Sequence, residues 1–241
     1  GVDDYVNIPN SESLQFANHN EISILISINN HEITQTPDWF YYLSKSNQIG
    51  GGGFDGFVIR AGADGGAPFG YSGIIKTTNG EFGFGASGFI KDVWENLAIV
   101  YDGTSVKYYR DGILSNEQYN ISGNIIDFDG SLFIGSADGG NYHNVQAKID
   151  NVRIYKRSLN ENEIVSFSNN NAVDDNTLLA FYNFNSGQGT TLYDHSGNGN
   201  HGTIHGASWV ENIYGCTDSY ANNHNPDANW DDGSCEYPDN G

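Results

Sequence analysis

The chain has 241 residues, 30 of them acidic and 10 basic, which gives a formal net charge of −20. Such a charge repels nucleic-acid phosphates and anionic lipids, so it excludes most nucleic-acid-binding and membrane-surface roles and makes cations natural partners. No apolar run approaches the roughly 18 residues that a membrane-spanning helix requires, so membrane insertion is not expected.

Strand patterns run along most of the chain. Isoleucines at every second position from Ile22 to Ile28 alternate with Ser23 and Ser27, which predicts a strand with one buried face. Further strands are expected at residues 39–43, 56–61, 73–77, 81–86, 94–101, 106–110, 131–134, 147–155 and 178–184. With 31 glycines, 15 tyrosines and 13 phenylalanines, this spacing predicts an all-β fold, a sandwich of two sheets.

The turns between these segments favour antiparallel pairing. Asn79-Gly80, Asp102-Gly103 and Asp111-Gly112 each lie between apolar runs, where a tight hairpin needs residues that accept a left-handed backbone. One short helix is expected at residues 159–168, because Ser158 and Glu161 have the spacing of a capping box.

Two cysteines, Cys216 and Cys235, lie near the end of the chain. A bridge between them would close one short loop and leave the large domain without a crosslink. An oxidising, extracellular compartment fits this pattern best. The chain starts at Gly1 without a signal peptide, as expected of a processed chain or an excised fragment.

Several segments carry a family resemblance. They are GVDDYVNIPNSESLQF, WENLAIVYDGTSVKYYRDG, SLFIGS, KIDNVRIYKRSLNENEI and LLAFYNFNSGQGTTLYDHSGNGNHGTIHGASW. Through them, residues 1–212 resemble the laminin G-like, concanavalin A-like jelly-roll domains of secreted bacterial proteins. The resemblance implies a jelly-roll sandwich.

The order of these segments departs from the family, because the segment LLAFYNF…DHSGNGNHGT precedes DDYVNIPNS in many such domains and follows it here. The strand order is therefore expected to be permuted. The late strand either closes the sheet of its own domain, which we favour, or pairs with a neighbouring repeat and leaves an open edge.

Residues 213–241 form a separate tail. Its segment YGCTDSYANNHNPDANWDDGSCEY resembles a small acidic repeat of Bacteroidetes-type secreted proteins, broadly similar to thrombospondin type 3 calcium repeats. The resemblance implies a loop that is closed by a disulfide between Cys216 and Cys235 and that binds calcium.

Side-chain oxygens in the tail alternate with the spacing of a calcium loop before a sharp glycine turn. The candidate ligands are Asn225, Asp227, Asn229, Asp231 and Asp232, with help from Asp218 and Asn222. The pattern lacks the distal glutamate and the flanking helices of an EF-hand. A solvated acidic turn remains the alternative, since acidic surfaces also keep secreted proteins soluble without a ligand.

A second calcium site is predicted in the sandwich. Asp194, Ser196 and Asn198 alternate with glycines, so their oxygens can converge, although such sequences also form ordinary turns. Asp150 has the strand parity of the apolar Val152 and Ile154, where a carboxylate requires a cation or hydrogen-bond donors. Family resemblance also gives Asp150 a structural or metal-binding role.

Trp39, Tyr41 and Asp55 are the candidate ligand-binding residues. Exposed rings beside acidic and amide side chains can stack on a sugar and hydrogen-bond to it, although a buried strand contributes the same residue types. Asp55 follows a glycine run that could border a ligand site.

The motifs of jelly-roll glycosidases and polysaccharide lyases, and nucleophile motifs such as GxSxG, are absent from the sequence, so catalysis is not expected. The leading hypothesis is a secreted, calcium-dependent, lectin-like or adhesive module of the bacterial cell surface that binds an extracellular polysaccharide or surface glycan. The alternatives are a calcium-stiffened structural module with protein partners or neighbouring repeats, and an uncommon hydrolase or lyase.

Overall fold

The computed structural model describes residues 4–31, 39–47, 55–62, 70–88, 90–140, 144–172, 174–211, 213–228, 230–231 and 233–238. The chain divides into two compact units, Gly1–Ala207 and Ser208–Gly241. None of the helices among the described residues is long and apolar enough to cross a bilayer.

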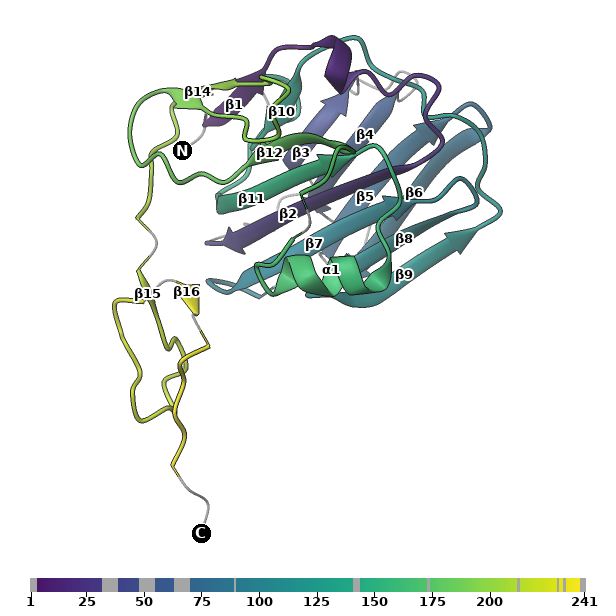
Figure 1. Cartoon of the computed structure of the whole chain (residues 1–241). Helices are drawn as coiled ribbons and strands as arrows, with labels where there is room; N and C mark the ends of the chain where they lie inside the picture. The colour runs from purple at the N-terminus through teal and green to yellow at the C-terminus, as the bar shows by residue number, and fades with distance from the viewer. Residues whose placement is uncertain are drawn as a thin grey trace. The chain divides into compact units, whose positions relative to one another are not determined.

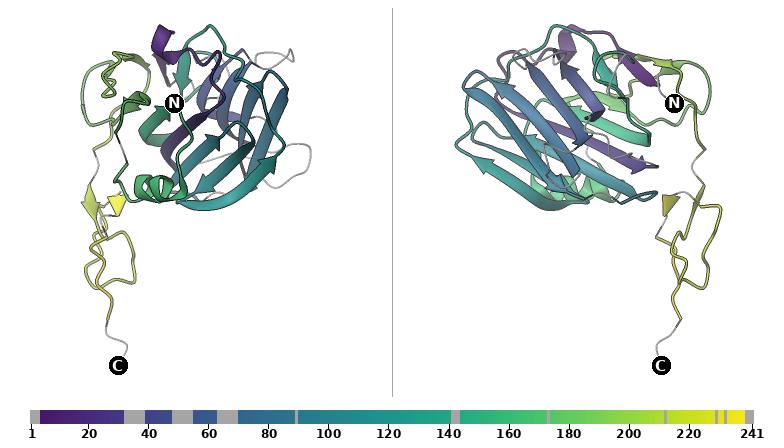
Figure 2. Two further views of the ribbon diagram at one scale, coloured as in Figure 1. Left: turned by 45° about the vertical axis from the view of Figure 1, so that its right-hand side comes forward. Right: turned by 180° about the vertical axis from the view of Figure 1, so that it is seen from behind.

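The first unit is a sandwich of two antiparallel sheets (Figures 1 and 2), which confirms the all-β jelly-roll prediction. In order across the eight-stranded sheet lie β13 (Thr191–Leu192), β14 (Gly202–His205), β1 (Tyr5–Ile8), β10 (Leu132–Ile134), β3 (Phe40–Ser46), β4 (Gly56–Gly62), β5 (Gly70–Thr77) and β6 (Gly80–Ser87). The six-stranded sheet has the order β12 (Leu178–Tyr182), β11 (Ala147–Tyr155), β2 (Ile22–Asn30), β7 (Trp94–Tyr101), β8 (Ser105–Arg110) and β9 (Ile113–Tyr119).

The hairpin predictions are confirmed. Antiparallel pairing joins β5 to β6 across Asn79-Gly80, β7 to β8 across Asp102-Gly103 and β8 to β9 across Asp111-Gly112. Asp111 and Gly112 have φ of 51° and 78°, the left-handed values that such turns need. In the sandwich, strands β1, β9, β13 and β14 were not among the predicted ranges, and the strand predicted for residues 178–184 ends at Tyr182.

Strand β2 is buried on both faces, so the prediction of a single buried face is wrong. The face with the even-numbered isoleucines points to the eight-stranded sheet, because Asn30, with the same parity, accepts a hydrogen bond from Tyr42 of β3. On the opposite face, Leu25 packs in one cluster with Ile164 and Phe167 of the helix. The helix covers a surface that the sequence pattern left to solvent.

The helix α1 (Glu161–Ser168) crosses the outside of the six-stranded sheet (Figure 1) and confirms the helix prediction. Its capping box is formed by Asn160 and Glu163 and not by the predicted pair. The predicted cap residue Ser158 instead donates its hydroxyl to Glu21, 3.1 Å away. The pairs Ser158/Glu161 and Asn160/Glu163 have the same spacing, so the sequence alone does not show which of them caps the helix.

The late strand lies within its own domain. Strand β12 pairs with β11, and β14 pairs with β1, both antiparallel. This is the first of the two arrangements that the permuted segment order allowed, and it leaves the segment 178–205 as an integral part of both sheets.

A buried polar network joins the sheets next to β3, β4 and β5. Tyr42 and Tyr71, from the eight-stranded sheet, bond to Asn30 at 2.6 and 2.7 Å, and Tyr71 also donates to the buried carboxylate of Glu95. Burial raises the pKa of both tyrosines far above the usual range, and the nearby Glu95 adds to the effect. Both phenols therefore remain donors, and Arg110 neutralises Glu95.

Candidate functional site

The outer face of the eight-stranded sheet, which points away from the six-stranded sheet, carries the candidate site. Tyr71 points inward to the six-stranded sheet, so its neighbour Ser72 points outward. Arg60 lies opposite Ser72, and Tyr41 lies opposite Arg60. Directly paired residues share a face of the sheet, so all three side chains belong to the outer face.

The outer face has a small apolar cluster of its own. It consists of Tyr41, Val58, Ile74 and Ala137, with the partly buried Trp39 packed against them. Because these residues lie outside the main core between the sheets, they give the outer face a firm aromatic and aliphatic base.

Trp39 and Tyr41 enclose Arg60. The Cζ atom of Arg60 lies 3.8 Å from the centroid of the Trp39 ring and 5.8 Å from that of Tyr41. Arg60 Nη1 donates to the Tyr41 hydroxyl at 3.2 Å. The Trp39 ring also lies against Gly62, where an added Cβ would come within 2.5 Å of its Cε3 atom. The structure thus brings Trp39 and Tyr41 together as predicted ligand-binding candidates and adds Arg60.

A second aromatic group lies on the same outer face. Tyr5 stacks on His205 with ring centroids 4.6 Å apart and meets the edge of Phe133 at 6.2 Å. Asn7, paired with Phe133, has a buried amide oxygen without a hydrogen-bond partner among the described residues. Rings and polar groups therefore extend along this face from β1 to β4.

Asp55 does not join this group. It precedes β4, whereas Arg60 lies near the other end of that strand. Its backbone N–H and its carboxylate form a closed pair of 2.9 Å hydrogen bonds with Asn47. Asp55 therefore closes the β3–β4 connection in the described residues, and its predicted ligand-binding role has no support from its position.

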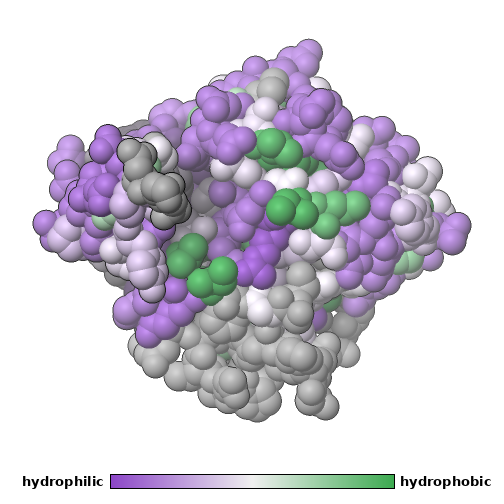
Figure 3. Space-filling model, turned by 90° about the horizontal axis from the view of Figure 1, so that it is seen from below, coloured by the Kyte–Doolittle hydropathy of each residue, from purple (hydrophilic) through white to green (hydrophobic). Residues whose placement is uncertain are grey.

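A separate depression of about 540 Å³ lies at the β12–β13 connection and is lined by Ser186, Gln188, Gly189 and Tyr193. Tyr193 is half exposed and meets the edge of the His201 ring. The view in Figure 3 shows a mainly hydrophilic surface with small, separate hydrophobic areas. This depression offers one exposed ring and no buried charge, so we treat it as a secondary candidate.

Asp194, a predicted calcium ligand, is a buried hydrogen-bond acceptor. Its Oδ1 accepts from the backbone N–H groups of Phe181 and Ser196, and its Oδ2 accepts from the Ser196 hydroxyl and the Asn200 N–H, all at 2.8–3.0 Å. Asn198 donates to the Leu178 carbonyl at 3.0 Å. These bonds tie the loop to β12 and satisfy the carboxylate with protein donors.

Asp150 does not lie on the face that its sequence parity predicts. It pairs with Ser27, whereas Ile154 pairs with Ile24, and Ser27 and Ile24 lie on opposite faces of β2. An irregularity in pairing between Asp150 and Arg153, with Asn151 at φ 48°, reverses the parity. The Asp150 carboxylate accepts a 2.6 Å hydrogen bond from the Asn151 N–H.

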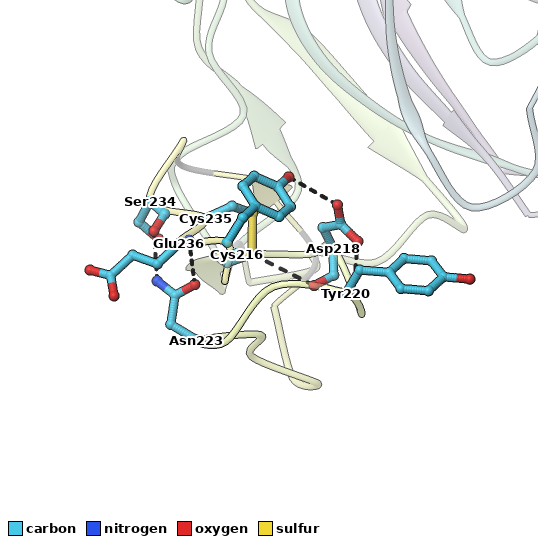
Figure 4. The surroundings of a disulfide bond; sticks show 8 residues. Cys216, Asp218, Tyr220, Asn223, Ser234, Cys235 and Glu236 are labelled. Carbon is cyan, nitrogen blue, oxygen red and sulfur yellow. Dashed lines mark hydrogen bonds between the residues drawn. A yellow bond between two sulfur atoms is a disulfide. The ribbon is translucent and has the colours of Figure 1, made fainter. Parts of the chain in front are cut away.

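The tail is organised by the disulfide between Cys216 and Cys235, as the resemblance implies. Short strands β15 (Tyr214–Gly215) and β16 (Trp230–Asp231) pair in parallel beside it. Figure 4 shows the Asp218 carboxylate bonded to the Tyr220 N–H and to a tyrosine hydroxyl, that of Tyr237, each at 2.9 Å. These two bonds hold the pKa of Asp218 below its usual value.

The predicted calcium ligands of the tail are only partly described. Asn225 Oδ1 accepts from the Asp227 N–H at 3.1 Å, as in an ordinary turn. Asn229 and Asp232 lie outside the described residues, as does the side chain of Asp231. Within the described residues, no group of three His, Cys, Asp or Glu side chains is placed to hold a metal ion. The described residues therefore leave calcium binding by the tail a prediction.

The ammonium group of Lys45 occupies an oxygen-rich site in the sandwich. The fully buried Lys45 donates to Asn10 Oδ1 and to the carbonyls of Phe128 and Gly130 at 2.6–3.1 Å, and Asp127 lies 3.6 Å away. Burial lowers the pKa of Lys45, and the charge of Asp127 opposes that shift. The lysine supplies the positive charge that this cluster of oxygens needs.

Comparison with known proteins places this fold. The laminin G model described as the Concanavalin A-like lectin/glucanases superfamily matches residues 1–165. A Bacteroides ovatus protein described as a candidate carbohydrate binding protein is similar, with 16% identity over 84% of this chain and 56% of that protein, at a TM-score of 0.63. No curated protein matches the chain.

Two toxin domains are also similar in fold. The binding domain of Paraclostridial Mosquitocidal Protein 1 has 16% identity over 69% of this chain and 41% of that one, at a TM-score of 0.54. The binding domain of Botulinum Neurotoxin DC, in complex with SialylT, has 14% identity over 71% of this chain and 40% of that one, at a TM-score of 0.52. The chain thus spans less than two thirds of each of these structures.

Proposed function

The chain belongs to the Concanavalin A-like lectin/glucanases superfamily, and from this premise we propose that it binds carbohydrate on the outer face of its eight-stranded sheet, without breaking a bond. The observation that carries the proposal is the group of Trp39, Tyr41 and Arg60. Aromatic rings stack on the C–H faces of sugars, and a nearby guanidinium donates to their oxygens.

The position of these side chains supports this proposal. All three lie on or beside paired strands, which hold binding groups more firmly than loops do. Trp39 remains partly exposed while one part of its ring packs on Arg60 and Gly62. The relatives described as a carbohydrate binding protein and as the binding domains of two toxins lend weight to a binding role.

A glycan array tests this function. We expect the full chain to bind a subset of glycans, and Trp39→Ala to lose roughly tenfold or more in affinity, since stacked aromatic rings contribute strongly to binding. Tyr193→Ala, which removes an exposed ring from the secondary depression, should bind as the wild type does. The chain should not cleave the glycans that it binds, so an assay for new reducing ends should stay at background.

One outcome would contradict this function, and another would contradict the site assigned to it. If no glycan binds, a structural or protein-interaction module replaces it. If Tyr193→Ala abolishes binding while Trp39→Ala does not, the secondary depression is the site.

Calcium binding by the tail and an extracellular location remain part of the proposal. The disulfide supports an oxidising compartment. Asp227, exposed within the loop that the disulfide closes, is a carboxylate available to a cation. Isothermal titration of the full chain with CaCl₂ should show binding that Asp227→Asn weakens and that Glu12→Gln, a change at an exposed carboxylate of the sandwich, leaves unchanged. No heat of binding would remove calcium from the function.

A further inference from the structure

Arg60 is a buried cation whose charge the described residues leave uncompensated. It is 8% exposed. Its Nε has no hydrogen-bond partner among the described residues, and its one protein hydrogen bond there runs from Nη1 to the neutral hydroxyl of Tyr41. A guanidinium is a permanent cation with five N–H donors, so most of its hydrogen-bonding capacity is unused.

The other arginines of the chain behave differently. Arg110 pairs with Glu95, Arg153 with Asp174, and Arg157 with both Glu163 and Asp175. In a chain with 30 acidic and 10 basic residues, carboxylate partners are plentiful. Within the described part of the structure, only Arg60 among the four arginines lacks one.

Arg153 provides an internal comparison, because it has almost the same burial and the same stacking as Arg60. It is 7% exposed, and its Cζ lies 3.5 Å from the centroid of Phe181. It also donates to Asn151 at 2.9 Å and forms the ion pair with Asp174. Stacking on an aromatic ring therefore does not prevent a buried arginine of this fold from also pairing with a carboxylate.

We infer that Arg60 is the specificity-determining residue of the binding face and that it selects glycans that carry a carboxylate. This inference rests on the proposed function. The planar fork of the guanidinium matches a carboxylate with two parallel hydrogen bonds, which a neutral hydroxyl cannot provide. Trp39 fixes the plane of the fork by stacking on it, and the partly exposed ring of Trp39 remains beside the sugar to which the carboxylate is attached.

An array that carries neutral, carboxylated and sulfated oligosaccharides tests this inference. The wild type should bind carboxylated glycans about 10- to 100-fold more tightly than their methyl esters, the range expected for charge-assisted hydrogen bonds. Arg60→Gln should lose that preference and keep weak binding of the esters. Arg60→Lys should keep only part of it, because the ammonium retains the charge without the fork.

Each other result has a defined meaning. Binding of sulfated glycans alone would show that the fork selects an oxyanion but would overturn the carboxylate assignment. Binding of neutral glycans alone would overturn the inference and leave the proposed function intact. No binding at all would overturn both.

Thermal unfolding separates a recognition role from a structural one. Removal of an uncompensated buried charge should not destabilise the free protein, so Arg60→Met should melt within about 2 °C of the wild type or above it. Arg153→Met, which removes both the ion pair with Asp174 and the hydrogen bond to Asn151, should melt clearly lower. A large loss of stability in Arg60→Met would identify Arg60 as a structural residue and overturn the inference.

Discussion

Replacement of Asp194 tests whether its loop is held by hydrogen bonds or by calcium. The carboxylate is 7% exposed and accepts four hydrogen bonds, three from backbone N–H groups and one from the Ser196 hydroxyl. Asp194→Asn keeps one oxygen and turns the other into an NH₂ group. That group faces two donors that it cannot satisfy.

The magnitude follows from the contacts that are lost. Hydrogen bonds to a charged group each contribute about 1.5–3 kcal/mol, and two of them disappear. Neighbouring bonds are not additive, so we expect Asp194→Asn to reduce the free energy of unfolding by about 3 kcal/mol. For a unit of this size, that change lowers the melting temperature by roughly 6–12 °C.

The assay is thermal unfolding followed by circular dichroism, in CaCl₂ and again in EDTA. Hydrogen bonding predicts the same difference between variant and wild type in both buffers. Glu12→Gln, at an exposed carboxylate in the short 3₁₀ turn Glu12–Leu14, is the control and should melt as the wild type does. The reasoning is refuted if EDTA lowers the wild type to the level of the variant, because calcium would then hold the loop.

Three further predictions concern the rest of the chain. Cys216→Ser opens a loop with a sequence separation of 19 and should destabilise the tail unit by about 3 kcal/mol without moving the sandwich transition, as two-phase urea unfolding would reveal. Hydrogen bonds from Arg157 lower the pKa of Glu163, so the stability they provide is present above about pH 4.5 and lost as the pH falls through the lowered pKa. Arg157→Gln should therefore flatten the loss of stability between pH 5 and roughly pH 3 in urea unfolding. Lys45→Met leaves the Asp127 carboxylate buried without its cation and should reduce the free energy of unfolding by about 3–5 kcal/mol, measured at pH 7.

Local patterns predicted the strands and hairpins because they are set by residues close in sequence. The alternation from Ile22 to Ile28 and the turn at Asp111-Gly112 each express backbone geometry that needs no distant partner. Local patterns could not predict long-range packing. The second buried face of β2 depends on a helix that follows more than 130 residues later, at Glu161–Ser168.

The candidate site was only partly predictable. Trp39 and Tyr41 could be selected because aromatic residues beside a turn are typical of sugar-binding surfaces. Arg60 was missed, although a single arginine in the apolar strand GFVIRAG was a visible signal. The parity prediction for Asp150 failed because a pairing irregularity inserts one extra residue into β11, and no local sequence pattern indicates it.

Side-chain oxygens explain why the predicted calcium loops remained ambiguous. An Asp or Asn that can coordinate a cation also accepts an N–H group two residues further along the chain, as Asp194 does from Ser196 and Asn225 does from Asp227. The two arrangements use the same spacing. Only the position of the donors in three dimensions distinguishes them, and at Asp194 four donors already fill the carboxylate.

The net charge and Arg60 act on a carboxylated glycan over different distances, and this gives a last prediction. The charge of −20 repels an anion at long range, whereas the guanidinium attracts it at contact in a partly desolvated setting. Salt shortens the Debye length from about 30 Å at 10 mM to about 8 Å at 150 mM, which weakens the repulsion far more than the contact. Affinity for a carboxylated glycan should therefore stay level or rise over this range in isothermal titrations. A steep fall in affinity would mean that long-range attraction by a basic surface, and not the contact with Arg60, holds the glycan.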